Sequence, residues 1–178
     1  MKNIVLIVGG ARSGKSTYAV QLAKKSKQKV IFIATCTFKD EEMEGRIKQH
    51  RLSRPSSWKV IVEGKNIAAV LQKMNSSKHA LVVDCLGLWV SNLLEDKLTD
   101  RQIEQEFKKL ASVLDKAKGT VILVSNEVGC GLVPAYFLGR RFRDLLGRAN
   151  QIIAKKADEV FLMQIGFPTQ LKVRKAEK

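Results

Sequence analysis

The sequence predicts an α/β fold in which helices flank a mainly parallel sheet. Short apolar runs alternate with segments whose apolar residues recur at helical spacing. The first run, residues 4–8, leads directly into a glycine-rich loop, and a helix-like segment follows the loop. The runs are apolar throughout rather than alternating, which is typical of strands that are buried on both faces of a parallel sheet.

The first half of the chain alternates strands with helices. Its apolar runs are rich in β-branched residues and predict strands. The segment from Asp40 has acidic residues in its first turn and Pro55 just past its end, which predicts a helix. In chain order we expect a strand at 4–8, a helix at 17–23, a strand at 30–34, a helix at 40–53, a strand at 58–62, a helix at 67–74 and a strand at 80–83.

The second half continues the same alternation. Apolar residues at 103, 107, 110, 111 and 114 predict an amphipathic helix that ends near Gly119. Pro134 is expected to start a long helix, because proline is favoured in a first helical turn. The other predicted elements are a strand at 121–124, the long helix continuing to Ile153, and strands at 160–163 and 171–173.

A phosphate-binding loop follows the first predicted strand. Gly9 and Gly14 let the backbone curl so that its N–H groups point at phosphate oxygens. Lys15 supplies a charge for the β- and γ-phosphates, and the Ser16 hydroxyl can ligate Mg²⁺. The alternative is a chance glycine turn, but the strand before the loop and the helix after it are the context that the motif requires. The complete G-x-x-x-x-G-K-[ST] motif consists of Gly9, Gly10, Ala11, Arg12, Ser13, Gly14, Lys15 and Ser16.

Asp84 closes the predicted strand at 80–83, where a phosphate-loop NTPase places its second metal-site carboxylate. The alternative is a solvated turn residue or a cap for the segment that follows. Ligands of parallel α/β sheets bind beyond the carboxyl ends of the strands. We therefore expect Gly9, residues 34–36, Asp84 and residues 125–127 to converge on one crevice.

His50 is the candidate nucleophile. Arg46 and Arg54 lie four residues before and after it, so the three share a face if the helix persists that far. A neutral imidazole between arginines suits attack on phosphorus, because the arginines hold the triphosphate while the ring nitrogen displaces pyrophosphate. The spacing alone favours the alternative, in which Met43, Ile47 and His50 form an ordinary core-facing stripe.

Bulk composition limits the other possibilities. At 178 residues, with 45% hydrophobic and 28% charged residues, the chain is expected to form one domain over residues 1–178. No apolar run approaches the ~20 residues of a membrane span. Cleaving the first residues as a signal peptide would destroy the loop, so we expect a cytoplasmic protein. The three cysteines show no CxxC spacing, which indicates reduced thiols rather than a disulfide framework or a zinc site.

The net charge of +15 permits three explanations: nucleic-acid binding, a polyanionic small substrate or a basic proteome. The basic residues are dispersed, and the aromatic residues, 6% of the chain, are not interleaved with them. Stacking platforms for single strands are therefore not indicated, and no nucleic-acid partner is expected.

Several stretches together resemble the bifunctional adenosylcobinamide kinase / adenosylcobinamide-phosphate guanylyltransferase family of cobalamin biosynthesis. The His-Arg-x-x-Arg-Pro and Asn-Glu-Val-Gly-x-Gly-x-Val-Pro segments are the most specific. The resemblance covers nearly the whole chain in order. The matching stretches are GGARSGKS at 9–16, IATC at 33–36, DEEMEGRIKQHRLSRPSSW at 40–58, VDCLGLWVSNLL at 83–94 and SNEVGCGLVPAYFLGRRFRDLLGRANQIIAKKADEVFLMQIG at 125–166.

The resemblance implies a RecA-like P-loop NTPase fold, a homotrimer and two reactions. The first phosphorylates the aminopropanol hydroxyl of adenosylcobinamide with ATP or GTP. The second takes GMP from GTP onto a histidine and passes it to the new phosphate, giving adenosylcobinamide-GDP. The family often has two adjacent histidines where this chain has Gln49 and His50, so His50 is the one candidate nucleophile.

The site residues that the resemblance implies fall into three groups. The catalytic residues are His50 and Lys15, and the Mg²⁺ ligands are Ser16 and Asp84. Besides the loop at 9–16, the expected nucleotide contacts are Ala34, Thr35, Cys36, Arg51, Leu52, Ser53, Arg54, Glu63 and Asp84. Two other functions stay open: a small-molecule P-loop kinase without a covalent step, for which His50 is dispensable, and a basic P-loop switch that binds nucleic acid.

Overall fold

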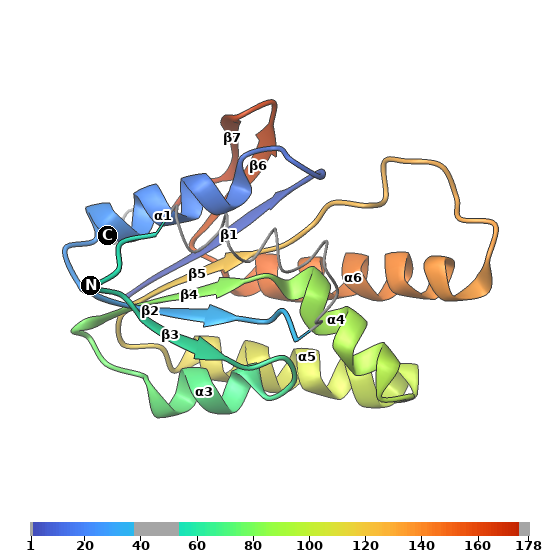
Figure 1. The fold of residues 1–178 in the computed structure, drawn as a ribbon, viewed down its shortest axis with the longest axis horizontal. Helices are drawn as coiled ribbons and strands as arrows, with labels where there is room; N and C mark the ends of the chain where they lie inside the picture. Colours follow the sequence, from blue (N-terminus) through green and yellow to red (C-terminus); the bar gives the residue numbers. More distant parts are fainter. Residues whose placement is uncertain (1, 38–53, 175–178) are drawn as a thin grey trace.

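A seven-stranded sheet in the order β3-β2-β4-β5-β1-β6-β7 runs through the molecule (Figure 1). The structure, a computed structural model, describes residues 2–37 and 54–174. All neighbouring strands pair in parallel except β7, which is antiparallel to β6. The strands are β1 (Asn3–Gly9), β2 (Lys29–Ala34), β3 (Lys59–Val62), β4 (His79–Asp84), β5 (Thr120–Val124), β6 (Glu159–Gln164) and β7 (Phe167–Lys172).

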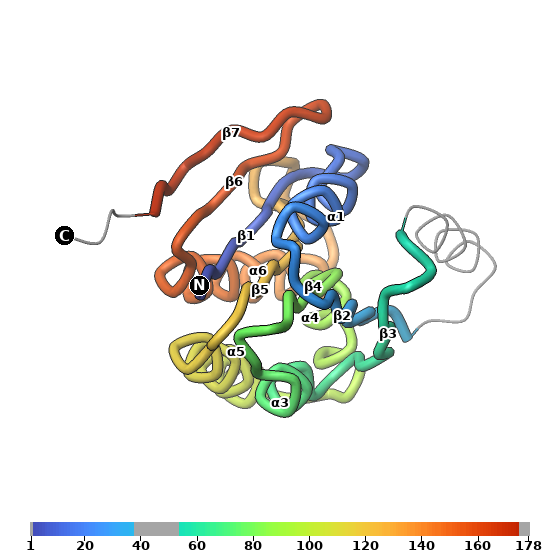
Figure 2. The backbone as a smooth tube through the Cα atoms, turned by 90° about the vertical axis from the view of Figure 1, so that its left-hand side faces the viewer, coloured from blue at the N-terminus to red at the C-terminus, as the bar shows by residue number. Residues whose placement is uncertain are grey.

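Helices cover both faces of the sheet. Helix α1 packs on one face, and the other described helices pack on the opposite face, as the view in Figure 2 also shows. Alternate residues of β1 supply the two cores: Leu6 faces the larger one, and Ile7 faces the one beneath α1. The helices are α1 (Lys15–Lys25), α3 (Ile67–Lys73), α4 (Leu86–Glu95), α5 (Asp100–Asp115) and α6 (Phe137–Lys156).

This topology confirms the predicted α/β class and places the predicted site at one edge. The central strands β2, β4, β5 and β1 are buried along nearly their whole length, which is why their sequences are continuously apolar. Because they run parallel, their carboxyl ends, and the loops that follow, meet at the same edge of the sheet. Among the described residues, no helix is long and apolar enough to cross a membrane.

The structure adds one helix to the prediction and corrects two of the predicted boundaries. Helix α4 was not predicted at all. Helix α6 begins at Phe137 rather than at Pro134, because the guanidinium of Arg140 binds the carbonyl oxygens of Pro134 and Ala135, which would otherwise serve the first helical turn. Strand β7 begins at Phe167, four residues before the predicted start at 171, because it pairs with β6 across a two-residue turn. The helix predicted at 40–53 lies outside the described residues.

Candidate nucleotide site

The phosphate-binding loop joins β1 to α1, as its sequence predicts (Figure 1). Gly14 is the N-cap of α1, and its φ of 91° is a left-handed conformation that glycine adopts without strain. No side chain caps α1, so the first backbone N–H groups of the helix are directed toward the loop, as an anion site requires. The amino terminus of α1 therefore offers N–H donors and a favourable electrostatic environment to a phosphate.

The β6–β7 hairpin supports this loop from outside. The Gly166 N–H donates to the Ser13 carbonyl at 3.2 Å. A Cβ at Gly9 would lie 2.5 Å from the Met163 carbonyl oxygen, and one at Gly14 would lie 3.2 Å from the Gly166 Cα. The first and last glycines of the motif are therefore required by contact with this hairpin as well as by any bound phosphate.

Lys15 lies buried within the loop, with its ammonium group bonded to the Gly10 carbonyl and to Ser13 Oγ at 3.3 Å. Burial lowers the pKa of Lys15, and the nearby Cys85 and Asp84 oppose that shift. Burial of the Cys85 thiol, with Asp84 beside it, raises the pKa of Cys85 to about 12, so the thiol is neutral at physiological pH. Lys15 and Asp84 are thus the charged pair at the centre of the site.

Thr35 joins the end of β2 to the end of β4. Its N–H donates to the Asp84 carbonyl at 3.2 Å, and its hydroxyl accepts from the Cys85 N–H at 2.7 Å. The same hydroxyl lies 2.8 Å from the Cys85 carbonyl, to which it donates. Thr35 is fully buried, and these hydrogen bonds hold the predicted segment 34–36 against Asp84.

The residues after β5 reach the same edge. The Ser125 N–H donates to Ile7 at 2.8 Å, and the Glu127 N–H donates to Gly9 at 2.9 Å. The amide oxygen of Asn126 lies 3.5 Å from the Cys85 sulfur. The structure therefore brings together the strand ends that the sequence predicts to converge.

Glu63 and Arg54 lie beside this centre. Glu63 follows β3 and donates its N–H to the Ala34 carbonyl at 2.9 Å, while its carboxylate accepts from the N–H groups of Lys65 and Asn66 at 2.8 and 2.9 Å. The Arg54 guanidinium lies 3.9 Å from the centre of the Phe32 ring. The half-buried side chain of Cys36 lies next to Thr35. The remaining predicted residues, His50, Arg51, Leu52 and Ser53, lie outside the described residues.

The oxygen donors suit magnesium. Ser16, on the first turn of α1, and Asp84, at the end of β4, offer a hydroxyl and a carboxylate at the same edge. Mg²⁺ commonly takes one or two protein oxygens and completes its shell with phosphate and water. Within 2–37 and 54–174, no group of three or more His, Cys, Asp or Glu could hold a metal ion.

Two asparagines of the site, Asn92 and Asn150, were not predicted from the sequence. Asn126 and Asn150 form one chain: the Ser125 hydroxyl donates to Asn150 Oδ1 at 2.5 Å, and Asn150 Nδ2 donates to the Asn126 carbonyl at 3.0 Å. Asn92, on α4, binds the segment after β2. Both lie in stretches that carry the family resemblance, 83–94 and 125–166, but no spacing rule relates an asparagine to a distant backbone carbonyl.

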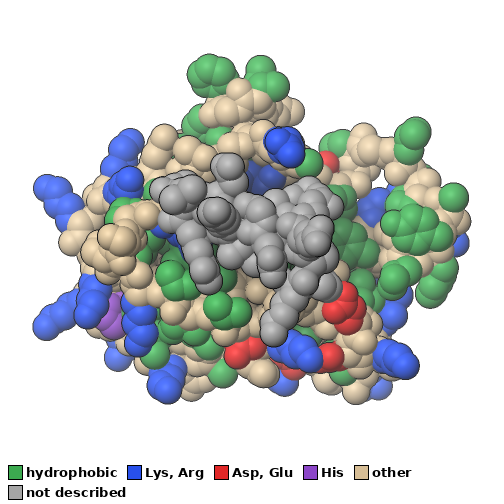
Figure 3. All heavy atoms as spheres, in the orientation of Figure 1, with side chains coloured by type: hydrophobic (Ala, Val, Ile, Leu, Met, Phe, Trp, Pro, Cys, Tyr) green, Lys and Arg blue, Asp and Glu red, His purple; other side chains and the backbone are tan. Residues whose placement is uncertain are grey.

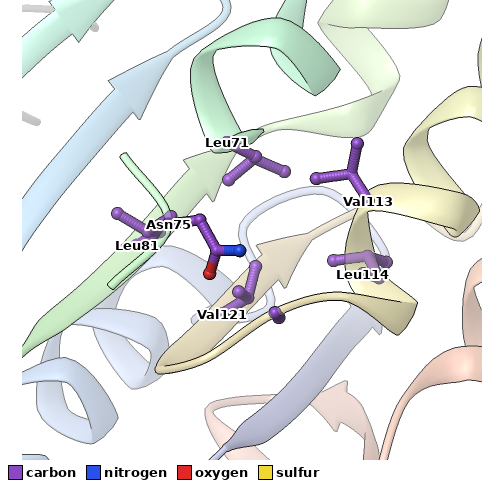
Figure 4. Close-up of a pocket in the computed structure, with 7 residues that line it drawn as sticks. Leu71, Asn75, Leu81, Val113, Leu114 and Val121 are labelled. Carbon is purple, nitrogen blue, oxygen red and sulfur yellow. The ribbon is translucent and has the colours of Figure 1, made fainter. Parts of the chain in front are cut away.

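Other surface features lie away from this edge. A cavity of about 10 Å³ lies between α3, α5 and the sheet, where Asn75 projects among Leu71, Leu81 and Val121 (Figure 4). It has room for no more than one water.

Exposed lysines gather over the amino ends of the strands (Figure 3). They include Lys24, Lys27, Lys29, Lys78 and Lys118.

Comparison with known proteins identifies the family. A family model described as cobinamide kinase / cobinamide phosphate guanyltransferase matches residues 5–171. The chain belongs to this family. The resemblance inferred from the sequence motifs is therefore confirmed.

Curated relatives agree with this cobinamide kinase / guanyltransferase membership. The chain is 42% identical, over 169 residues, to the bifunctional adenosylcobalamin biosynthesis protein CobP of Pseudomonas aeruginosa, covering 94% of this chain and 96% of that protein. It is 34% identical, over 181 residues, to CobU of Escherichia coli, a protein of the same description, covering 95% of this chain and 99% of that one.

Solved structures support the predicted P-loop NTPase fold with its RecA-like, mainly parallel sheet. The flagellar accessory protein FlaH of Methanocaldococcus jannaschii superposes with a TM-score of 0.54 at 14% identity, covering 97% of this chain and 79% of FlaH. An ATPase of a bacterial type III secretion system gives 0.56 at 13% identity, covering 94% and 56%. At such identities the likeness is one of fold, and it confirms the fold class.

Proposed function

We propose that this chain catalyses two consecutive reactions at one nucleotide site. It phosphorylates the aminopropanol hydroxyl of adenosylcobinamide with ATP or GTP, and it then transfers GMP from GTP, through a guanylylated His50, to give adenosylcobinamide-GDP. Family membership and relatives named as bifunctional support the pair of reactions. The observation that carries the proposal is that the phosphate loop, Asp84 and Thr35 meet at one edge of the sheet.

In the kinase step, the loop amides and Lys15 hold the triphosphate and stabilise charge on the transferring oxygens. Lys15 exchanges the Gly10 carbonyl and Ser13 hydroxyl, which it binds here, for phosphate oxygens. A phosphate charge beside Lys15 offsets the burial that lowers its pKa, so the bound lysine stays charged. Ser16 and Asp84 would hold Mg²⁺, which neutralises charge on the phosphates when it is bound.

In the second step, a ring nitrogen of His50 attacks the α-phosphorus of GTP, and pyrophosphate leaves. The phosphoramidate keeps the GMP unit activated, so one difficult transfer becomes two easier ones. We assign the segments 34–36 and 51–54 and the carboxylate of Glu63 to nucleotide contacts around this centre. The hydrogen bonds of Thr35 support that assignment, because they hold the segment 34–36 against Asp84.

We further propose a single P-loop nucleotide-binding domain over residues 1–178, acting in the cytoplasm as a homotrimer and without a nucleic-acid partner. One continuous sheet through the described residues supports the single domain. The aromatic residues, which are not interleaved with the basic ones along the sequence, support the last point, because single strands need such stacking platforms.

GTP labelled at the α-phosphate tests the covalent step. We expect acid-labile, alkali-stable label, the signature of a P–N bond, on the wild-type protein and none on His50→Ala, because His50 is the proposed nucleophile. The kinase reaction, followed with ATP and adenosylcobinamide, should persist in His50→Ala and be lost in Lys15→Ala.

An unlabelled but kinase-active wild type would instead establish the kinase without a covalent step. Tight RNA or DNA binding that weakens steeply with salt, together with no turnover of corrinoid, would establish the nucleic-acid switch.

A further inference from the structure

Asn92 is a buried polar side chain that contacts two strand ends of the site. It lies on α4 and is 1% exposed. Its Nδ2 donates to the Thr35 carbonyl and to the Gly64 carbonyl, each at 2.9 Å, and its Oδ1 accepts from the Thr37 hydroxyl at 3.1 Å. Both donor hydrogens and the acceptor of the amide are therefore used.

The backbone around Asn92 is packed to fit it. A Cβ at Gly64 would lie 2.5 Å from Thr37 Cγ2 and 2.7 Å from Asn92 Nδ2. One turn earlier on α4, the indole N–H of Trp89 donates to the Lys65 carbonyl at 2.8 Å. Helix α4 thus holds two consecutive carbonyls of the β3–α3 connection and, through Asn92, the chain that leaves β2.

These two segments are the ones that the proposed guanylyl transfer needs. Thr35 and Cys36 are assigned nucleotide contacts, Glu63 immediately precedes Gly64, and the chain that continues from Thr37 carries His50. The phosphate loop of the kinase machinery is anchored differently, through β1, α1 and the β6–β7 hairpin. Asn92 contacts none of those three elements in the hydrogen bonds it makes. Asp84 is joined to Thr35 through the Thr35 N–H, and not through the carbonyl that Asn92 binds.

We propose that Asn92 is a positioning residue for guanylyl transfer: by bridging Thr35, Thr37 and Gly64, it fixes the spacing between the segments after β2 and β3. The inference rests on the proposed function, because it concerns the second of the two reactions. A structural role alone would lower stability and both activities together. A positioning role lowers guanylylation selectively.

The first test compares Asn92→Asp with Asn75→Asp. Asn75 is a matched control, because its amide also bridges two backbone groups, the Lys116 carbonyl and the Lys118 N–H, each at 2.8 Å, at the opposite edge of the sheet (Figure 4). In Asn92→Asp a carboxylate oxygen replaces Nδ2 and faces two carbonyl oxygens. We expect kcat/KM for guanylylation by α-labelled GTP to fall by about tenfold or more, with kinase kcat/KM changed less than about threefold.

A second test reaches the same bridge without removing any hydrogen-bonding group. Gly64→Ala inserts a methyl between Thr37 and Asn92, whereas Gly147→Ala, on α6, meets no atom within 4 Å. We expect Gly64→Ala to reproduce the selective loss and Gly147→Ala to leave both rates unchanged. Thermal unfolding of each variant identifies any that fail to fold.

The outcomes distinguish failure of the positioning role of Asn92 from failure of the proposed function. If folded Asn92→Asp and Gly64→Ala lose both activities in parallel, or lose neither, the positioning role is wrong while the proposed function stands. If the wild type takes no label, the proposed function fails, and the inference about Asn92 fails with it.

Discussion

Glu127 and Cys130 interact at the start of the β5–α6 connection. Burial of the Glu127 carboxylate works to raise its pKa, but hydrogen bonds from the Gly129 and Cys130 N–H groups outweigh it and lower the pKa. The exposed Cys130 thiol shows the converse effect: its hydrogen bond to Glu127 and the negative charge of that residue raise the pKa of Cys130. An accessible thiol is thereby kept mostly protonated.

Alkylation of Cys130 tests this pairing. A thiolate is the reactive form, so a raised pKa slows reaction at any pH below that pKa. In Glu127→Gln the charge is removed, the pKa of Cys130 falls toward its ordinary value, and iodoacetamide should modify Cys130 several-fold faster at pH 8. The rate is measured by mass spectrometry of the Cys130 peptide.

Cys85 is the internal control for that measurement, since its pKa of about 12 should keep it unmodified in both proteins. An unchanged rate at Cys130 would show that Glu127 does not face the thiol in solution.

At the residue scale, predictability depends on how far apart the partners lie in the sequence. Gly14 and Lys15 could be assigned because the phosphate motif is local. Its eight consecutive positions contain both the glycine that the backbone needs and the lysine whose charge the phosphates need. Asn92 could not, because its partner Thr35 lies 57 positions away and nothing in the sequence pairs them. The role of His50 stays a prediction.

At the scale of elements, the turn of the β6–β7 hairpin contacts the phosphate loop and also contains a residue with a strained backbone. Its two residues, Ile165 and Gly166, have φ values of 46° and 90°, the pattern of a type I′ turn. Glycine and asparagine accept such angles, whereas a β-branched residue is strained there. Ile165 is also 89% exposed, so its side chain gains little from burial in the described part of the molecule.

Ile165→Asn should therefore stabilise the protein. Asparagine fits the first position of a type I′ turn, and removing the strain should add about 0.5–1 kcal/mol to the free energy of unfolding. Urea denaturation measures the change. Gly166→Ala is the opposing control: no atom lies within 4 Å of its Cβ, so any loss of stability comes from the backbone conformation alone. A destabilised Ile165→Asn would mean that the isoleucine packs against something in the folded protein.

Helices were predictable where only one face is buried, and strands were predictable where the whole run is buried. Helix α5 shows a clear apolar stripe and a capping box between Thr99 and Gln102, and its sequence predicted it. Helix α4 is buried on almost every side, so it has no polar face to reveal the helical period, and no side chain caps it. The start of α6 was misplaced because the contact between Arg140 and the Pro134 carbonyl overrides the preference of proline for a first turn.

At the scale of the whole molecule, the sheet order explains why one edge carries the site. Strand β1 lies between β5 and β6, and β4 follows on the far side of β5, so the loop and Asp84 face the same region across one intervening strand. The rule that ligands bind at carboxyl ends was enough to predict this convergence. The same rule does not predict which side chains are exposed on the outer surface.

Apolar side chains gather on the β5–α6 connection and the start of α6 (Figure 3). Leu132 is 98% exposed and Phe137 is 72% exposed. The other exposed apolar residues of this surface are Val133, Tyr136 and Leu138. Monomeric proteins rarely expose a continuous apolar patch of this kind, which is typical of an interface.

If the chain is the proposed homotrimer, this surface is where we expect subunits to meet. The double variant Leu132→Asp, Phe137→Asp places charges that cannot be buried without a partner, so it should sediment as a monomer in analytical ultracentrifugation, while the wild type sediments as a trimer. Leu171→Asp is the control, because Leu171 is 61% exposed but lies on β7, away from the connection (Figure 1). Dissociation by Leu171→Asp alone would place the interface on the hairpin, and a monomeric wild type would refute the trimer itself.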